Sequence, residues 1–142
     1  NESLWTHSTG NRLASMFYFM IDPESGDMDY ACAGQIPCLV CGPHAEIDPL
    51  TDDNPQLGLD PDYRYHQVDR ELSPGHSLVL FTRGHLTPLD EELCDPDECR
   101  VAELLQKHGN SSAEEQVQAV TDELGATSLQ QQRTVLVAQR TL

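Results

Sequence analysis

The spacing of apolar and polar positions predicts strands in the first half of the chain and near its C-terminal end. Segment 15–22 is rich in aromatic and branched apolar residues, and segment 77–82 is almost continuously apolar, which is typical of a central strand. Asp, Pro and Gly in segment 22–27 favour a hairpin turn, and Pro and Asp punctuate segment 46–62, which predicts a loop. The predicted strands and short apolar runs are 15–22, 28–34, 37–41, 63–72, 77–82 and 133–139.

Two helices with clear start and stop signals are predicted between the last two strands. In segment 94–109, Asp95 is placed as N-cap with Glu98 to complete a capping box, Pro96 suits the first helical position, and Gly109 ends the helix. Segment 111–125 repeats this design, with Ser112 and Glu115 as the capping box and Gly125 as the end.

One face of each predicted helix is apolar, as packing against a sheet requires. The apolar residues at helical spacing are Val101, Leu104 and Leu105 in the first helix and Val117, Val120 and Leu124 in the second. Residues 1–7 are consistent with the end of a further helix. The elements together predict an α+β fold, a mostly antiparallel β-sheet packed by helices.

Composition and charge narrow the classes of partner. The chain has 142 residues, which predicts one domain over 1–142, and 24 acidic against eight basic residues give a formal charge of −16. This charge argues against nucleic acid or an anionic membrane as partner and is compatible with a basic protein partner. Neither an apolar run of membrane-spanning length nor a basic-then-apolar leader is visible, so we expect a cytoplasmic protein.

The five cysteines do not follow the spacing of a small disulfide-stapled domain, so we expect reduced thiols. A four-thiolate zinc site could be drawn from Cys38-x-x-Cys41 and Cys94-x4-Cys99. Residues three apart on a strand face opposite ways, however, and Cys99 lies beside a packing position of a helix. Structural thiols are therefore the favoured interpretation, with no metal site, and the six histidines lack ligand spacing.

The order of these landmarks resembles the C-terminal half of the bacterial PPM phosphatases, the branch typified by stage II sporulation protein E and RsbU. The resemblance rests on the strand "MFYFMID", the turn "PESGD", "YACAGQIP", "PQLGLDPD", "ELSPGHSLVLFTRG" and the final "QQQRTVLVAQR", and it extends over nearly all of the chain. It implies a PPM phosphatase-like α/β sandwich, of which 1–142 would be part of a larger domain.

The resemblance also implies a chemistry, and this sequence departs from the motifs that carry it. Family members are metal-dependent protein Ser/Thr phosphatases in which Asp side chains hold two Mn²⁺ or Mg²⁺ ions that activate a water. Position by position, the family's "TDG" aspartate falls at Arg83, its "AGH" histidine at Gln35 and its "DD" pair at Gln131 and Gln132, while Thr134 matches the family's Thr. The motif positions of this half that would touch metal or phosphate are thus substituted.

Two interpretations of Arg83 follow from its charge. A guanidinium could stand where a cation stood and pair with a carboxylate or with a partner's phosphate. Alternatively, the position has drifted after loss of activity, which is also the favoured interpretation of Gln131 and Gln132. Gln35 is expected to serve a turn that Gly34 and Pro37 shape. The candidate contacts to a partner or phosphate are Arg83, Gly84, His85 and Thr134.

The sequence therefore predicts a degenerate, non-catalytic phosphatase-like module that acts by protein contact in a bacterial sigma-factor or response-regulator pathway. It resembles in this respect the phosphatase-like effector domains behind response-regulator receivers, including the RssB-like adaptors. No cofactor is expected in this interpretation. The alternative is an active Mn²⁺- or Mg²⁺-dependent phosphatase whose remaining metal ligands come from an N-terminal half. If the chain is stable alone, we expect a homodimer.

Overall fold

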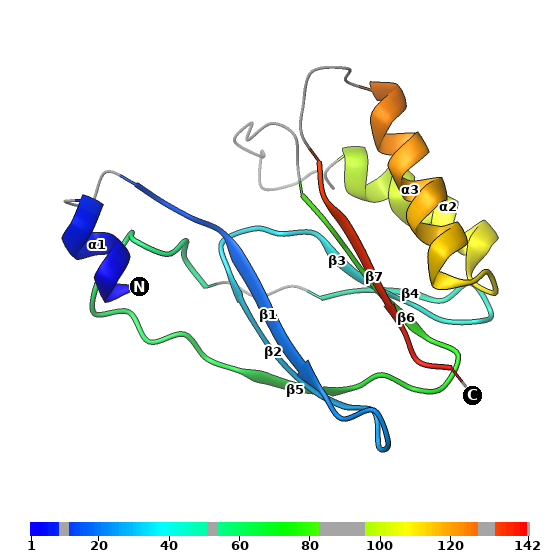
Figure 1. The fold of residues 1–142 in the computed structure, drawn as a ribbon, viewed down its shortest axis with the longest axis horizontal. Coiled ribbons are helices and arrows are strands. Elements are labelled where there is room, and N and C mark those ends of the chain that lie inside the picture. Colours follow the sequence, from blue (N-terminus) through cyan, green and yellow to red (C-terminus); the bar gives the residue numbers. More distant parts are fainter. Residues whose placement is uncertain (9–11, 51–53, 83–95, 128–132, 142) are drawn as a thin grey trace. The chain divides into compact units, whose positions relative to one another are not determined.

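The computed structural model describes residues 1–8, 12–50, 54–82, 96–127 and 133–141 (Figure 1). The chain divides into two compact units, which are described separately below. Unit 1 comprises Asn1–Ile36 and Thr51–Glu71, and unit 2 comprises Pro37–Leu50 and Leu72–Leu142. The prediction that 1–142 form one phosphatase-like domain, itself part of a larger one, stays a prediction.

Unit 1 contains a short helix and a three-stranded antiparallel sheet. The helix α1 is Glu2–Ser8, and the strands, in the sheet order β1-β2-β5, are Met16–Ile21, Asp27–Ala33 and Val68–Glu71. The predicted hairpin is present, because β1 and β2 pair antiparallel from Met16↔Ala33 to Ile21↔Met28.

The turn of this hairpin is held by Asp22. The carboxylate Oδ1 of Asp22 accepts hydrogen bonds from the backbone N–H groups of Glu24 and Ser25, at 2.8 and 3.1 Å. Gly26 has φ +81°, a conformation that L-residues with side chains rarely adopt. The sequence "DPESGD" therefore supplies both the side-chain acceptor and the glycine that the turn requires.

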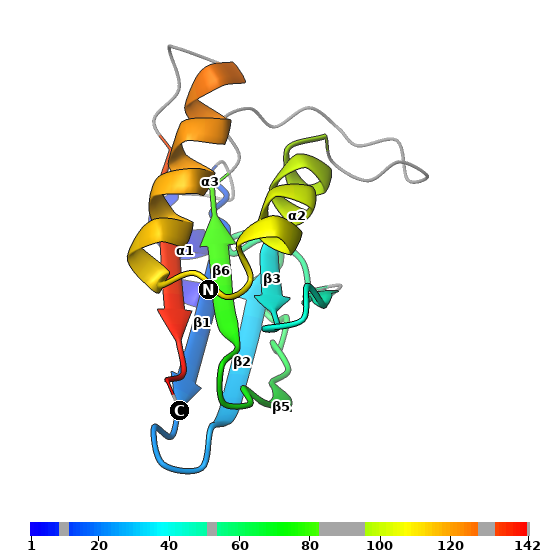
Figure 2. The same cartoon turned by 90° about the vertical axis from the view of Figure 1, so that its right-hand side faces the viewer.

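Unit 2 contains a four-stranded antiparallel sheet covered by two helices (Figure 2). The strands, in the order β4-β3-β6-β7, are Ile47–Pro49, Cys38–Cys41, Ser77–Phe81 and Val135–Gln139, and the helices α2 and α3 are Pro96–His108 and Ala113–Thr127. Strand β6 lies between β3 and β7, and all five of its residues are buried. The predictions of a central strand here and of an α+β fold are confirmed.

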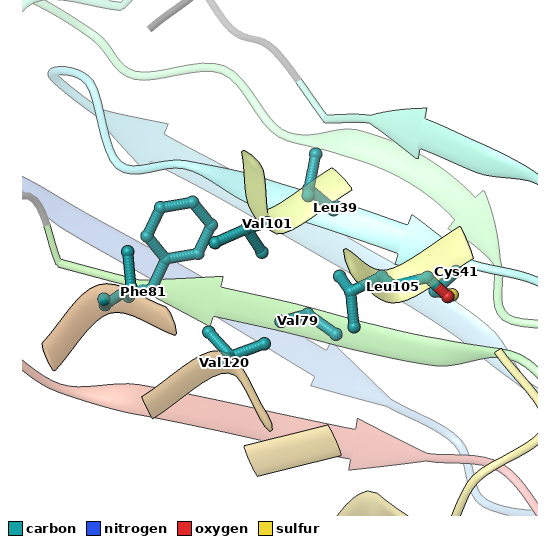
Figure 3. Close-up of a cluster of buried hydrophobic side chains, with 8 residues drawn as sticks. Leu39, Cys41, Val79, Phe81, Val101, Leu105 and Val120 are labelled. Carbon is teal, nitrogen blue, oxygen red and sulfur yellow. The ribbon is translucent and has the colours of Figure 1, made fainter. Parts of the chain in front are cut away.

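The core of unit 2 forms where the helices pack on one face of this sheet (Figure 3). Leu39 and Val79 are paired across β3 and β6, so their side chains lie on the same face. The fully buried members of the cluster are Leu39, Cys41, Val79, Phe81, Val101, Leu105, Val120 and Leu124. The helical stripes were largely predicted, but in α3 the buried residue of the first turns is Gln116, whereas Val117 is half-buried.

Three boundaries differ from the prediction. A short strand, β4, lies in the segment predicted as loop, because three residues are too few to show a periodic pattern. Strand β5 occupies only Val68–Glu71 of the predicted segment 63–72. Helix α3 continues past Gly125 to Thr127, since glycine inside a helix costs only about 1 kcal/mol and nothing after it forbids helix.

Candidate functional site

The C-terminal end of β6 and the N-terminal end of β7 lie side by side at one end of the sheet, which is called this edge below. Thr82 N–H donates to the Thr134 carbonyl at 2.9 Å, and Thr134 N–H donates to Thr82 Oγ1 at 2.8 Å. Phe81 and Val135, the residues just inside, are register partners. The last described residue after β6, Thr82, and the residue before β7, Thr134, therefore lie side by side at this end of the sheet.

Of the predicted contact residues, Thr134 lies at this edge. It is exposed, as is Thr82. The remaining predicted positions, Arg83, Gly84, His85, Gln131 and Gln132, lie outside the described residues. Their assignment stays a prediction.

Gln35 belongs to unit 1 and follows a glycine turn. Gly34 has φ +74°, and its N–H donates to the Asn54 carbonyl at 3.0 Å. A Cβ at Gly34 would lie 2.5 Å from Ser15 Oγ, so the position accepts only glycine without rearrangement. Gln35 itself is exposed. The turn that was expected around Gly34 is present, which leaves the interpretation of Gln35 as a turn residue in place.

A group of charged side chains that the motifs did not reveal lies beside Thr134. The Arg133 Nη1 donates to Asp97 Oδ2 at 2.7 Å, and Arg100 Nη2 donates to Asp97 Oδ1. The side chains of Arg133 and Asp97 are only 12% and 19% exposed, whereas that of Arg100 is 38% exposed. Asp97, Arg100 and Arg133 are called the arginine cluster below.

The arginine cluster joins the start of β7 to the first turns of α2. Asp97 and Arg100 are an i,i+3 pair on one helix, which sequence spacing can reveal. The contact between Asp97 and Arg133, by contrast, spans 36 residues. Only the antiparallel addition of β7 beside β6, with α2 packed against the sheet, brings these two residues together.

The cluster has a definite electrostatic character. Both carboxylate oxygens of Asp97 accept hydrogen bonds from guanidinium groups, so this carboxylate is already neutralised by cations. The Nε atoms of Arg100 and Arg133 are buried and have no hydrogen-bond partner among the described residues. The arrangement is therefore suited to an anion rather than to a divalent cation.

The cysteines of unit 2 are consistent with a packing role. Cys38 and Cys41 are buried and not in a disulfide, and Cys41 is a member of the core cluster whose Sγ lies 3.6 Å from the Leu105 carbonyl. Burial, and then the charge of Glu46, raise the pKa of the Cys41 thiol, which disfavours the thiolate that a zinc ion needs. Within the described ranges, no three His, Cys, Asp or Glu side chains are grouped to hold a metal.

One expectation about the cysteines was wrong. Cys99 takes part in a disulfide bond, whereas a reduced thiol was expected there. The expectation rested on the spacing of the cysteines along the chain, and such spacing does not determine which sulfur atoms come within bonding distance.

The chain matches several solved structures, among them a phosphatase domain and a PP2C domain. The phosphatase domain of SpoIIE from Bacillus subtilis matches with a TM-score of 0.68 and 11% identity, covering 99% of this chain and 65% of that chain. The SiaA-PP2C domain of Pseudomonas aeruginosa matches with a TM-score of 0.70 and 19% identity, covering 97% of this chain and 56% of that chain. The RsbU and RsbW domains of a Mycobacterium tuberculosis protein match with a TM-score of 0.71 and 19% identity, covering 99% of this chain and 40% of that chain.

These matches define the class, a PPM-type (PP2C) phosphatase domain fold. The family model described as Stage II sporulation protein E (SpoIIE) matches residues 1–141, so the chain belongs to the SpoIIE family. The resemblance inferred from the motifs is thereby confirmed. The chain spans about three-fifths of the length of the first two solved domains named above.

Two further findings concern relatives and membrane spans. Comparison with curated proteins finds no significant match. In the part of the chain that the structure describes, none of the helices combines the length and apolar character needed to cross a bilayer.

Proposed function

We propose that this chain is a degenerate, non-catalytic Ser/Thr protein phosphatase-like module that acts by protein contact in bacterial signal transduction, in a sigma-factor or response-regulator pathway. The PPM-type fold and the family are established by the comparisons. The loss of catalysis and the regulatory role are the proposal, and they rest on the residues at the edge where β6 ends and β7 begins.

The observation that carries the proposal is the charge at this edge. Arg83 follows Thr82 at the motif position where the resemblance calls for a metal-binding aspartate. Near the start of β7, the carboxylate of Asp97 is already paired with the guanidinium groups of Arg100 and Arg133. By the motif alignment, position 83 thus carries a cation where the metal-dependent site of the family needs a carboxylate.

The energetic consequence of Arg83 is large compared with ordinary substitutions. Two unit charges roughly 4 Å apart interact by about 4 kcal/mol at an effective dielectric near 20. Replacing an attraction by a repulsion beside a cation therefore costs on the order of twice that amount. Gln131 and Gln132 keep an oxygen acceptor but lack the negative charge that hard divalent ions select.

The second candidate function is an active Mn²⁺- or Mg²⁺-dependent protein Ser/Thr phosphatase. It is favoured by membership of a family whose solved relatives are phosphatase domains, and by the fact that this chain covers 65% of one of them and 56% of another. The additional length in those relatives leaves room for metal ligands outside the segment described here.

Calorimetric titration of Mn²⁺ into the full-length protein distinguishes the two candidates. The proposal predicts no saturable binding in the micromolar range for the wild-type protein. The variant Arg83→Asp with Gln131→Asp and Gln132→Asp serves as the matched comparison, because it restores the carboxylates of this half. Saturable, chelator-reversible Mn²⁺ binding by the wild-type protein would contradict the proposal.

A further inference from the structure

The two Nε–H donors of the arginine cluster are the unexplained feature of this edge. Both atoms are buried, and neither has a hydrogen-bond partner among the described residues. Buried donors in folded proteins are nearly always paired, so an unpaired one indicates an acceptor such as an ion or a water that binds there. Here two such donors occur on side chains that share one carboxylate.

The charge of the cluster identifies the kind of acceptor. Two guanidinium groups share one carboxylate, which leaves one unit of positive charge in excess within a chain whose net charge is −16. Each guanidinium uses one nitrogen on Asp97 and keeps its Nε–H unused. Unused guanidinium donors with excess positive charge are the usual partners of phosphate oxygens.

The cluster meets solvent through the Arg100 side chain, while both Nε atoms themselves are buried. The side chain of Arg100 is 38% exposed, and Arg133 directly precedes Thr134, which is exposed at the end of the sheet. Asp97 holds both guanidinium groups in place, so little side-chain freedom remains to be lost when an anion binds.

We propose that Arg100 and Arg133 form a metal-free binding site for a phosphate monoester. A tetrahedral phosphate can accept hydrogen bonds from two separate guanidinium groups approaching from different directions, and its negative charge is matched by the excess positive charge of the cluster. The inference rests on the proposed function and deepens it. It assigns to the contacted partner the chemistry of a phosphorylated side chain that is bound and not hydrolysed.

The site is tested with the full-length protein in the presence of a chelator. Inorganic phosphate, a phosphoserine peptide and the same peptide with serine are titrated while the ¹⁵N resonances of arginine Nε–H groups are followed. We expect saturable shifts of the Arg100 and Arg133 resonances with phosphate and with the phosphopeptide, and none with the serine peptide. If inorganic phosphate shifts these resonances but the phosphopeptide does not, the assignment of a phosphorylated partner is overturned.

Matched variants identify the residues responsible. Arg100→Gln should weaken phosphate binding about tenfold or more, because a hydrogen bond to a charged group is lost. Arg70→Gln, an exposed arginine of strand β5, should leave the affinity unchanged. Equal affinities of Arg100→Gln and wild type would overturn the proposal, as would unshifted Nε–H resonances at millimolar phosphate. Circular dichroism verifies that each variant is folded.

The outcomes separate this inference from the proposed function. In a parallel sample with Mn²⁺ in place of the chelator, release of inorganic phosphate from the phosphopeptide, monitored by ³¹P NMR, would contradict the proposed loss of catalysis, even if the arginine site binds as expected. If the phosphopeptide is neither bound nor hydrolysed, the arginine site is overturned, while the proposed loss of catalysis still stands.

Discussion

Cys41 is an ionisable residue whose properties follow directly from its position. It is the last residue of β3, fully buried against Leu105 of α2, and burial followed by the nearby charge of Glu46 raises the pKa of its thiol. The folded state therefore retains the thiol proton to higher pH than the unfolded chain does. Through this residue, the free energy of unfolding decreases as the pH rises above 9.0, the ordinary pKa of the thiol.

The first prediction concerns the reactivity of this thiol. Iodoacetamide should modify Cys41 much more slowly in the native chain than in urea, because the reactive thiolate is disfavoured and the sulfur is inaccessible. Mass spectrometry of the labelled peptide measures both rates. Equal rates in the two conditions would show that Cys41 is not buried.

A second prediction at this scale concerns Asp97. Asp97→Asn should lower the free energy of unfolding by about 1–3 kcal/mol, because Arg133, only 12% exposed, loses its charged acceptor. Arg100→Gln should cost less than about 1 kcal/mol, since Arg100 is 38% exposed and its ion pair is partly screened. Urea denaturation measures both. A larger effect of Arg100→Gln than of Asp97→Asn would contradict this ranking.

At the scale of elements, the start of α3 is the best-defined local signal. Ser112 N–H donates to Glu115 Oε2 at 2.9 Å, and Glu115 N–H donates to Ser112 Oγ at 3.3 Å, so the capping box read from the sequence is formed. Ser112→Ala should therefore lower the free energy of unfolding by about 1 kcal/mol at neutral pH. Urea denaturation tests this, with Ser25→Ala in a different turn as a comparison.

The same cap predicts a pH dependence. Hydrogen bonds from the backbone N–H and hydroxyl of Ser112 lower the pKa of the Glu115 carboxyl from its ordinary value of 4.5. A lowered folded-state pKa adds stability that is present above 4.5 and lost as the pH falls through the folded value. The difference between wild type and Ser112→Ala should accordingly be smaller at acid pH than at neutral pH. A difference that grows on acidification would contradict this sign.

The packing of α2 distinguishes neighbouring leucines. Leu105 is fully buried in the core cluster, whereas Leu104 packs at its margin and is half-buried. Leu105→Ala should cost about 2–5 kcal/mol, because it leaves a cavity, and Leu104→Ala should cost clearly less. Equal costs by denaturant titration would show that the helix face is assigned wrongly.

The elements also show how far the sequence could be interpreted. Long periodic segments with caps or turn residues, such as the hairpin of β1 and β2 and the helices, were predictable because local chemistry determines them. The three-residue strand β4 and the continuation of α3 past Gly125 were not, because pairing with β3 and helix extension depend on tertiary context. In the site, the meeting of Thr82 and Thr134 follows from strand order, but the contact of Arg133 with Asp97 does not.

On the scale of the whole molecule, the net charge of −16 opposes self-association through repulsion between like-charged chains. Strand β1 carries no charged residue, and Met16, Tyr18 and Met20 are about half exposed on alternate positions. An uncharged strand of this kind is prone to pair with another chain. We expect the isolated chain to dimerise, more strongly at high salt, where the repulsion between acidic chains is screened. A strictly monomeric sedimentation profile at all salt concentrations would contradict this prediction.

The central claim is that this member of the SpoIIE family works without phosphatase catalysis, and turnover of an aryl phosphate by the full-length protein tests it most directly. The assay is run with Mn²⁺, with Mg²⁺ and with a chelator. The substitutions at Arg83, Gln131 and Gln132 predict no metal-dependent hydrolysis above the rate of a heat-denatured sample. Hydrolysis that requires Mn²⁺ or Mg²⁺ and is abolished by the chelator would contradict the account.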